Sequence, residues 1–134
     1  AADLYLQACR LAPACWQLAA ECAQALLAAD RPQAWLDLSA ALPEPVRATG
    51  RIRYLIARAS LAAGDLDRVG HILRDGLVVP DMREGEVALS DLWFDYHAQQ
   101  LARREGLPLN DALRARVRRE CPPPALYDFR MVGE

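Results

Sequence analysis

Apolar residues recur along the chain with the spacing of an α-helix. The stripe Leu89, Leu92, Trp93 and Tyr96 follows the series i, i+3, i+4, i+7, which places all four side chains on one helical face. Strand patterns, in which β-branched and polar residues alternate, are nearly absent. The pattern therefore predicts an all-α protein.

Residues that start and stop helices mark the segments. Ser90 is expected to cap a helix that runs to about Glu105, and Asn110 a last helix that runs to about Glu120. Further toward the N-terminus, Asp30 is a candidate N-cap and Gly64 a candidate helix exit. These signals divide the chain into helices joined by tight turns, and such neighbours pack antiparallel.

Two parts of the chain are similar to each other at an offset of 35 residues. With Asp30 set against Asp65, Leu38 meets Leu73 and Ala41 meets Gly76. Each aligned stretch follows an apolar helical segment, 14–29 in the first case and 47–63 in the second. This is the signature of a helical repeat.

The second unit carries a small residue, Ala57, midway along its first helix, then the turn "AAGDLD", Leu73, Gly76 and a closing Pro80. It resembles the tetratricopeptide repeat. The resemblance implies stacked antiparallel helical hairpins that form a short right-handed α-solenoid, with a C-terminal capping hairpin and an extended tail.

On this interpretation the chain is one helical-repeat domain. Its parts are the end of a preceding repeat (1–12), two repeat units (13–46 and 47–80), and an acidic loop, capping hairpin and docked tail (81–134). The last part also looks like the C-terminal end of large bacterial repeat-containing proteins, in which a β-rich upstream region is suspected to handle carbohydrate. Since the sequence begins within a predicted helix and without Met, we expect it to be a fragment of a longer bacterial protein.

The composition of the chain argues against several classes of function. The net charge of −2 argues against a nucleic-acid binder overall, and no apolar run approaches the roughly 20 residues that span a bilayer. All 16 basic residues are arginine, so this chain has no lysine nucleophile. The four cysteines form no C-x-x-C pair, so we expect buried thiols in the cytoplasm and no metal or other cofactor.

The stretch 81–98 gathers acids and aromatics around His97 and allows a second interpretation. In it the chain is a helical accessory domain of a larger carbohydrate-acting enzyme or carbohydrate-binding protein, with His97 as a general base helped by Asp91 or Glu84. Against this, a half-buried histidine between two helices is common. The acids Asp81, Glu84 and Glu86 could suggest a metal site, but a solvated loop explains them.

Six arginines in the two last helices face only three acids, which raises nucleic-acid binding as a third possibility. Arg116 and Arg118 would contribute most directly. Because no aromatic residues interleave with these arginines, a solvated helix face is the simpler expectation.

A different group on the first helix of the second unit is the preferred site. Arg51, Tyr54 and Arg58 follow i, i+3, i+7 and so share one face. In tetratricopeptide-like stacks such first helices line the concave surface, and guanidinium groups bind carboxylates in bidentate fashion. The alternative is that both arginines pair with acids of neighbouring helices and that Tyr54 belongs to the core.

The expected function is therefore a non-catalytic protein–protein interaction or scaffold module. Its partner would be a peptide, another protein or the upstream domain of its own parent chain, bound at Arg51, Tyr54 and Arg58; self-association is also possible. The tail residues Tyr127, Phe129 and Met131 alternate, so they are expected to dock on the protein's own helices.

Overall fold

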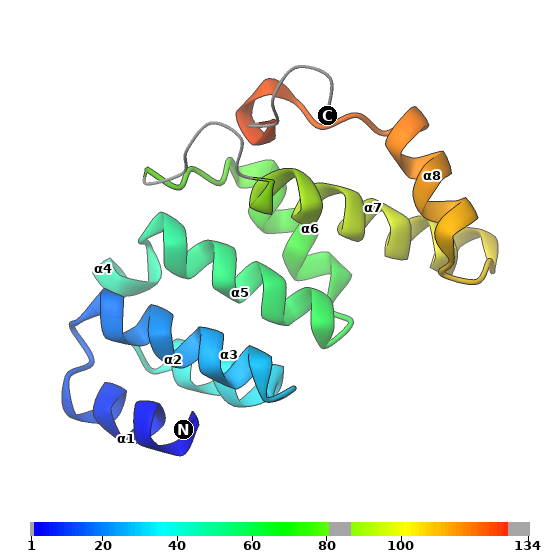
Figure 1. The fold of residues 1–134 in the computed structure, drawn as a ribbon. Coiled ribbons are helices and arrows are strands. Elements are labelled where there is room, and N and C mark those ends of the chain that lie inside the picture. The colour runs from blue at the N-terminus through cyan, green and yellow to red at the C-terminus, as the bar shows by residue number, and fades with distance from the viewer. Residues whose placement is uncertain (1, 81–86, 129–134) are drawn as a thin grey trace. The chain divides into compact units, whose positions relative to one another are not determined.

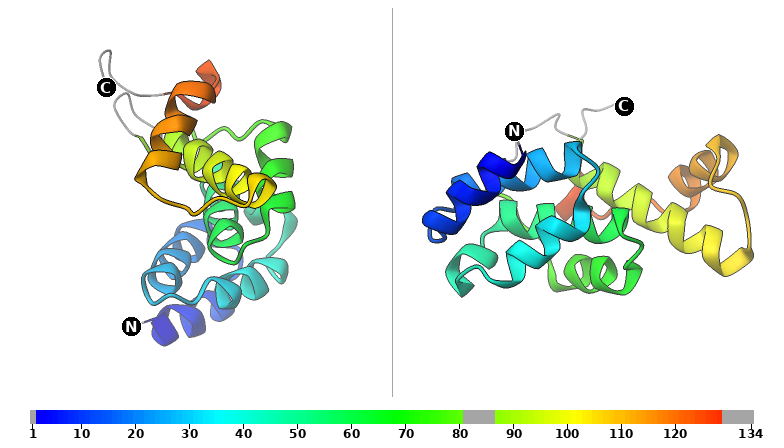
Figure 2. Two further views of the ribbon diagram at one scale, coloured as in Figure 1. Left: turned by 90° about the vertical axis from the view of Figure 1, so that its right-hand side faces the viewer. Right: turned by 90° about the horizontal axis from the view of Figure 1, so that it is seen from below.

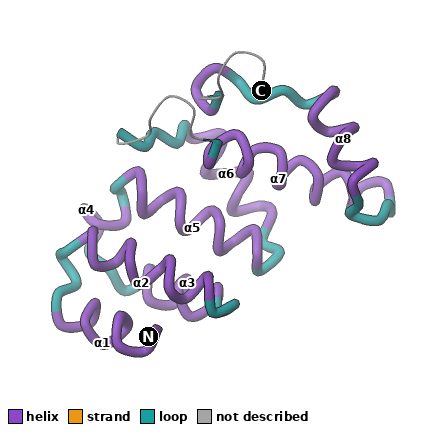
Figure 3. Tube along the Cα trace, viewed as in Figure 1, coloured by secondary structure: helices purple, strands orange, loops and turns teal. Residues whose placement is uncertain are grey.

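The structure is a computed structural model that describes residues 2–80 and 87–128. Within these ranges the chain is all-α, as the sequence predicts, and contains no strand (Figures 1 and 3). None of the helices in the described ranges is long and apolar enough to cross a membrane. The chain divides into two compact units, residues 1–65 and 66–134.

The 1–65 unit contains five helices in its described part. They are α1 (Ala2–Leu11), α2 (Trp16–Ala28), α3 (Pro32–Ala40), α4 (Glu44–Arg47) and α5 (Gly50–Ala62). Helix α2 packs against α1, α3 and α5, as the two further views in Figure 2 also show. Three of these helices contribute fully buried large side chains to the core of this unit: Leu26, Trp35 and Ile52.

The 66–134 unit is built around its longest helix. Helix α7 (Ala88–Glu105) contacts α6 (Leu66–Asp75), α8 (Asp111–Glu120) and the short 3-10 helix η1 (Ala125–Tyr127). A hydrophobic cluster joins α7 to α8, and its buried members are Phe94, Ala98, Leu101, Leu113 and Val117.

The boundary between the two compact units falls at residues 65 and 66, inside the predicted repeat unit 47–80. Helix α5 belongs to one unit and α6 to the other. The single repeat domain, its unit boundaries and the solenoid arrangement stay predictions.

The exit of α2 corrects the prediction that Asp30 caps the next helix. Asp30 has φ +56°, in the left-handed region, and its N–H donates to Leu27 O at 3.1 Å. The next N–H, of Arg31, donates to Leu26 O at 2.8 Å. This pair of bonds is a Schellman motif in which Asp30 stands where glycine is usual. The N-cap of α3 is Arg31, which makes no side-chain capping bond.

We expect Asp30→Gly to raise the free energy of unfolding by about 0.5–1 kcal/mol. Glycine enters the left-handed region without the steric cost that other residues have, and the change removes an acid from a helix C-terminus. Urea denaturation followed by circular dichroism measures the effect. The matched control is Gln24→Gly, at an exposed position inside α2, which should instead cost about 1 kcal/mol. Equal losses in both variants would contradict the assignment.

Other helix ends agree with the sequence to different degrees. Asn110 caps α8 as predicted, because its side-chain oxygen accepts from Leu113 N–H at 3.0 Å. Helix α7 ends at Glu105 as predicted but begins earlier, at Ala88, so Ser90 lies in its first turn and donates to Val87 O. The segment after the prolines was expected to be extended, and it forms the one-turn helix η1 instead.

All four cysteines were expected to be buried thiols, but only two of them are buried. Cys9 and Cys22 are buried, Cys121 is half-buried and Cys15 is exposed at the start of α2. Burial raises the pKa of Cys9, and it raises the pKa of Cys22 to about 11. Both buried thiols are therefore protonated at neutral pH and unreactive.

Candidate functional site

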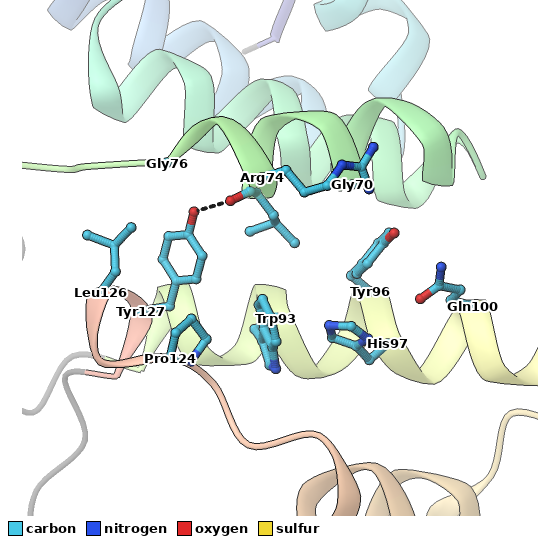
Figure 4. Close-up of a pocket in the computed structure, with 11 residues that line it drawn as sticks. Gly70, Arg74, Gly76, Trp93, Tyr96, His97, Gln100, Pro124, Leu126 and Tyr127 are labelled. Carbon is cyan, nitrogen blue, oxygen red and sulfur yellow. Dashed lines mark hydrogen bonds between the residues drawn. The ribbon is translucent and has the colours of Figure 1, made fainter.

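The 66–134 unit contains a pocket of about 490 Å³ between α6, α7 and the segment around η1 (Figure 4). We call it the α6–α7 pocket. Its described lining residues are Gly70, Leu73, Arg74, Gly76, Trp93, Tyr96, His97, Gln100, Pro124, Leu126 and Tyr127. Most of this surface is apolar or aromatic.

Helical spacing explains how α7 forms one wall. Trp93, Tyr96, His97 and Gln100 follow i, i+3, i+4, i+7, so one face of α7 carries all four side chains. Trp93 and Tyr96 belong to the stripe that the sequence predicts, whereas its other members, Leu89 and Leu92, are buried and do not line the pocket. His97, which was expected to lie beside that stripe at a helix–helix seam, is half-buried in this wall.

Helix α6 forms the opposite wall by the same rule. Gly70, Leu73 and Arg74 follow i, i+3, i+4. A Cβ atom added to Gly70 would lie 2.5 Å from the Tyr96 hydroxyl oxygen and 2.9 Å from Arg74 Nη1. Both polar groups therefore lie close to the Gly70 backbone, and any larger residue would displace them. This contact explains a glycine inside a helix, where it costs about 1 kcal/mol relative to alanine.

The third wall comes from the C-terminal segment and is held by Tyr127. The Tyr127 hydroxyl donates to the Leu73 carbonyl oxygen at 2.6 Å and accepts from Leu77 N–H at 2.9 Å. Its side chain is 2% exposed. The bond to Leu73 is dashed in Figure 4. Tyr127 therefore docks on the protein's own helices, as expected, whereas Phe129 and Met131 lie outside the described residues.

The aromatic side chains of the pocket contact one another. The ring centroids of Trp93 and His97 are 4.3 Å apart, those of Tyr96 and His97 are 5.0 Å apart, and those of Trp93 and Tyr127 are 5.9 Å apart. Trp93 Nε1–H donates to the Cys121 carbonyl oxygen at 2.9 Å, which fixes the indole. The rings thus form a preformed aromatic surface.

His97 is neutral at pH 7 in this setting. Burial lowers its pKa from the ordinary value, because the surrounding rings replace water around the charged form. Its Nε2 atom is buried and finds no hydrogen-bond partner in the described part of the chain. The imidazole therefore acts mainly as an apolar ring of the pocket wall.

The described part of the structure does not bring His97 and Asp91 together, as the enzyme interpretation requires. Among the described residues no hydrogen bond joins His97 to a carboxylate, and Asp91 is half-exposed on the same helix, six positions earlier. Asp81, Glu84 and Glu86, on which the base and metal hypotheses also depended, lie outside the described residues.

Arg116 and Arg118, the arginines expected to contribute most directly to nucleic-acid binding, have partners within the unit. Arg116 donates to Glu120 at 2.7 Å and lies 3.3 Å from a Glu105 oxygen. The hydrogen bond to Glu120, with the nearby Glu105 charge, raises the pKa of Arg116. The Arg118 guanidinium lies 4.6 Å above the Phe94 ring centroid. These contacts are typical of a solvated helix face that also covers a core residue.

The preferred site of the sequence, Arg51, Tyr54 and Arg58, lies on α5 in the 1–65 unit. All three side chains are half-exposed, and each takes part in a polar, electrostatic or ring interaction within the protein. The spacing on one helix places them on a shared face, as predicted. Their role as a clamp stays a prediction.

A second hollow, of about 360 Å³, lies in the 1–65 unit between α1 and α3. Its lining residues include Leu38 on α3 and Ala41, the C-cap of α3, which align with Leu73 and Gly76 at the offset of 35. Both pairs of aligned positions, on α3 and α6 or directly after them, thus line a hollow, each within its own unit. Unlike the α6–α7 pocket, this hollow has no aromatic lining residue among the described residues.

Reasoning from the sequence found Trp93, Tyr96, His97 and Tyr127 but missed Gly70, Arg74 and Gln100. A signal for α6 was present, because a glycine in the interior of a helix with Leu and Arg three and four residues later indicates a close approach on that face. Comparison with protein-family models, with curated proteins and with solved structures finds no match to this chain.

Proposed function

We propose that this protein is a non-catalytic interaction module that binds a peptide or a partner protein through the α6–α7 pocket. The observation that carries the proposal is the pocket itself, a preformed hollow of about 490 Å³ with aromatic walls. Ligand sites usually measure about 300–1,000 Å³ and are mostly apolar with a few polar groups. Tryptophan, tyrosine and arginine are also the residues that contribute most to binding energy at interfaces.

Two further observations support binding rather than catalysis as the role. His97 contacts Trp93 and Tyr96 and no carboxylate among the described residues, so an arrangement for general-base chemistry is missing there. The walls are fixed by hydrogen bonds from Trp93 and Tyr127, which lowers the entropic cost of binding.

The test uses two exposed leucines of the same unit. Leu126 lines the pocket and is 45% exposed, whereas Leu109 does not line it and is 43% exposed. Peptides selected from a random display library on the wild-type protein should bind Leu126→Asp at least about tenfold more weakly, because the charge opposes burial of an apolar side chain. Binding to Leu109→Asp should be unchanged. Selected peptides that bind Leu126→Asp as tightly as wild type would refute the pocket as the site.

A second surface for the same function is the α5 face formed by Arg51, Tyr54 and Arg58. The three side chains are half-exposed on one helix, which suits an acidic peptide. An Arg51→Glu, Arg58→Glu variant, checked for folding by circular dichroism, separates the surfaces. Peptides that lose binding to this variant and keep it with Leu126→Asp would assign the site to α5.

A further inference from the structure

We infer that the α6–α7 pocket recognises an aromatic group that carries a carboxylate. This inference rests on the proposed binding function and specifies the ligand. It follows from two parts of the pocket, the aromatic walls and a polar corner formed by Arg74 and Tyr96 beside Gly70.

The walls select a flat aromatic body. Helix α7 and η1 contribute the rings of Trp93, Tyr96, His97 and Tyr127 (Figure 4). Leu73 lines the pocket from α6. The volume of about 490 Å³ is roughly three times that of an apolar cavity that holds benzene. It therefore accommodates an aromatic side chain together with the atoms of its amino-acid backbone. Rings bind well to such walls because edge-to-face and offset-stacked contacts add to the burial of apolar area.

The polar corner selects an anion. Among the described residues that line the pocket, Arg74 is the only one with a full charge, and its guanidinium makes no ion pair or hydrogen bond within the described ranges. The Tyr96 hydroxyl likewise takes part in none of the hydrogen bonds there. Both groups approach the same point beside Gly70, so their donors are neighbours.

A guanidinium next to a hydroxyl offers converging N–H and O–H donors, which is the arrangement that a carboxylate accepts best. His97 is not needed for this contact, because its Nε2 atom is shielded from the pocket surface and burial keeps the ring neutral. The ligand charge is therefore expected at Arg74 and the ligand ring against Trp93 and His97.

Two sources supply this chemistry. One is a free aromatic acid, and the other is the last residue of a peptide with an aromatic side chain and a free C-terminal carboxylate. The polar corner makes the same contacts with either, so probes of both kinds are compared.

The experiment is isothermal titration of the full chain with matched probes. N-acetyl-tryptophan carries the carboxylate, and N-acetyl-tryptophanamide is its neutral equivalent. A second pair is a tetrapeptide that ends in tryptophan, with a free or an amidated C-terminus. The protein variants are Arg74→Gln, Gly70→Ala and the control Arg68→Gln, which makes the same charge change at an exposed position of α6 outside the pocket.

Wild type should bind the acid about tenfold more tightly than the amide, since one hydrogen-bonded charge contact has that effect. Arg74→Gln should abolish this preference, and Arg68→Gln should retain it. Gly70→Ala should reduce it without a charge change, because its Cβ occupies the space of the Tyr96 hydroxyl and Arg74 Nη1. If only the free-terminus tetrapeptide binds tightly, the source is a peptide C-terminus; if only N-acetyl-tryptophan does, it is a small acid.

Equal affinity for acid and amide, or a preference that survives Arg74→Gln, would overturn the anion assignment. No binding of any probe, while library peptides still depend on Leu126, would overturn the ligand class and leave the proposed function standing. Failure of the Leu126 test itself would remove the proposed function, so the two failures are distinguishable.

Discussion

Tyr127→Ala is expected to lower the free energy of unfolding of the 66–134 unit by about 3–5 kcal/mol. That is the usual cost of removing a fully buried aromatic side chain, and Tyr127 is 2% exposed. The change also removes the bonds to Leu73 O and Leu77 N–H and leaves both backbone groups without these partners. Urea denaturation measured by circular dichroism gives the loss.

Tyr127→Phe separates the hydroxyl from the ring. It keeps the aromatic contact with Trp93 and removes only the two hydrogen bonds, so a loss of about 1–3 kcal/mol is expected. Leu126→Ala, one residue earlier and 45% exposed, is the control and should cost less than about 1 kcal/mol. A Tyr127→Phe variant as stable as wild type would show that the hydroxyl does not hold the segment on α6.

The second large effect is expected in the other unit, at Trp35. This side chain is completely buried, and Trp35→Ala should cost about 3–5 kcal/mol because a cavity of indole size remains among the helices of the 1–65 unit. The same denaturation experiment measures it. If Trp35→Ala and Tyr127→Ala shift the whole transition, the two units unfold together; if each shifts only part of it, they unfold separately.

Trp35→Phe tests a particular feature of this residue. Trp35 Nε1 is buried and has no hydrogen-bond partner in the described part of the chain, which is itself unfavourable. Phenylalanine removes that donor while it retains one ring, so we expect a loss clearly smaller than that of Trp35→Ala. A loss as large as with alanine would indicate that the indole N–H has a partner such as a buried water.

Sequence reasoning was reliable where local chemistry decides the structure. Asn110 caps α8 because its side chain reaches an N–H three residues away, and such a contact is visible in the sequence. It was wrong at Asp30, because an acid before a helix suits an N-cap and also tolerates the left-handed exit of the preceding helix. The backbone of α2, and not the residue type, decides between the two.

The pocket was harder to predict for a different reason. The spacing of Trp93 and Tyr96 identifies a face of α7 but does not say which helix meets that face. The role of Arg74 and Gly70 in the pocket becomes visible only through the contact with Tyr96 across the α6–α7 interface. Tyr127 acts on α6 from 54 residues away, and no local pattern encodes such a pairing.

Because the hydrogen-bonded residues Tyr127 and Leu73 are 54 positions apart in the sequence, their contact forms late during synthesis. The ribosome adds Leu73 about 50 residues before Tyr127, which takes a few seconds at typical rates. Until Tyr127 is added, the Leu73 carbonyl and the Leu77 N–H lack the hydrogen-bond partner that they have in the folded unit. A ligand that needs all three walls therefore binds only chains to which the segment up to Tyr127 has already been added.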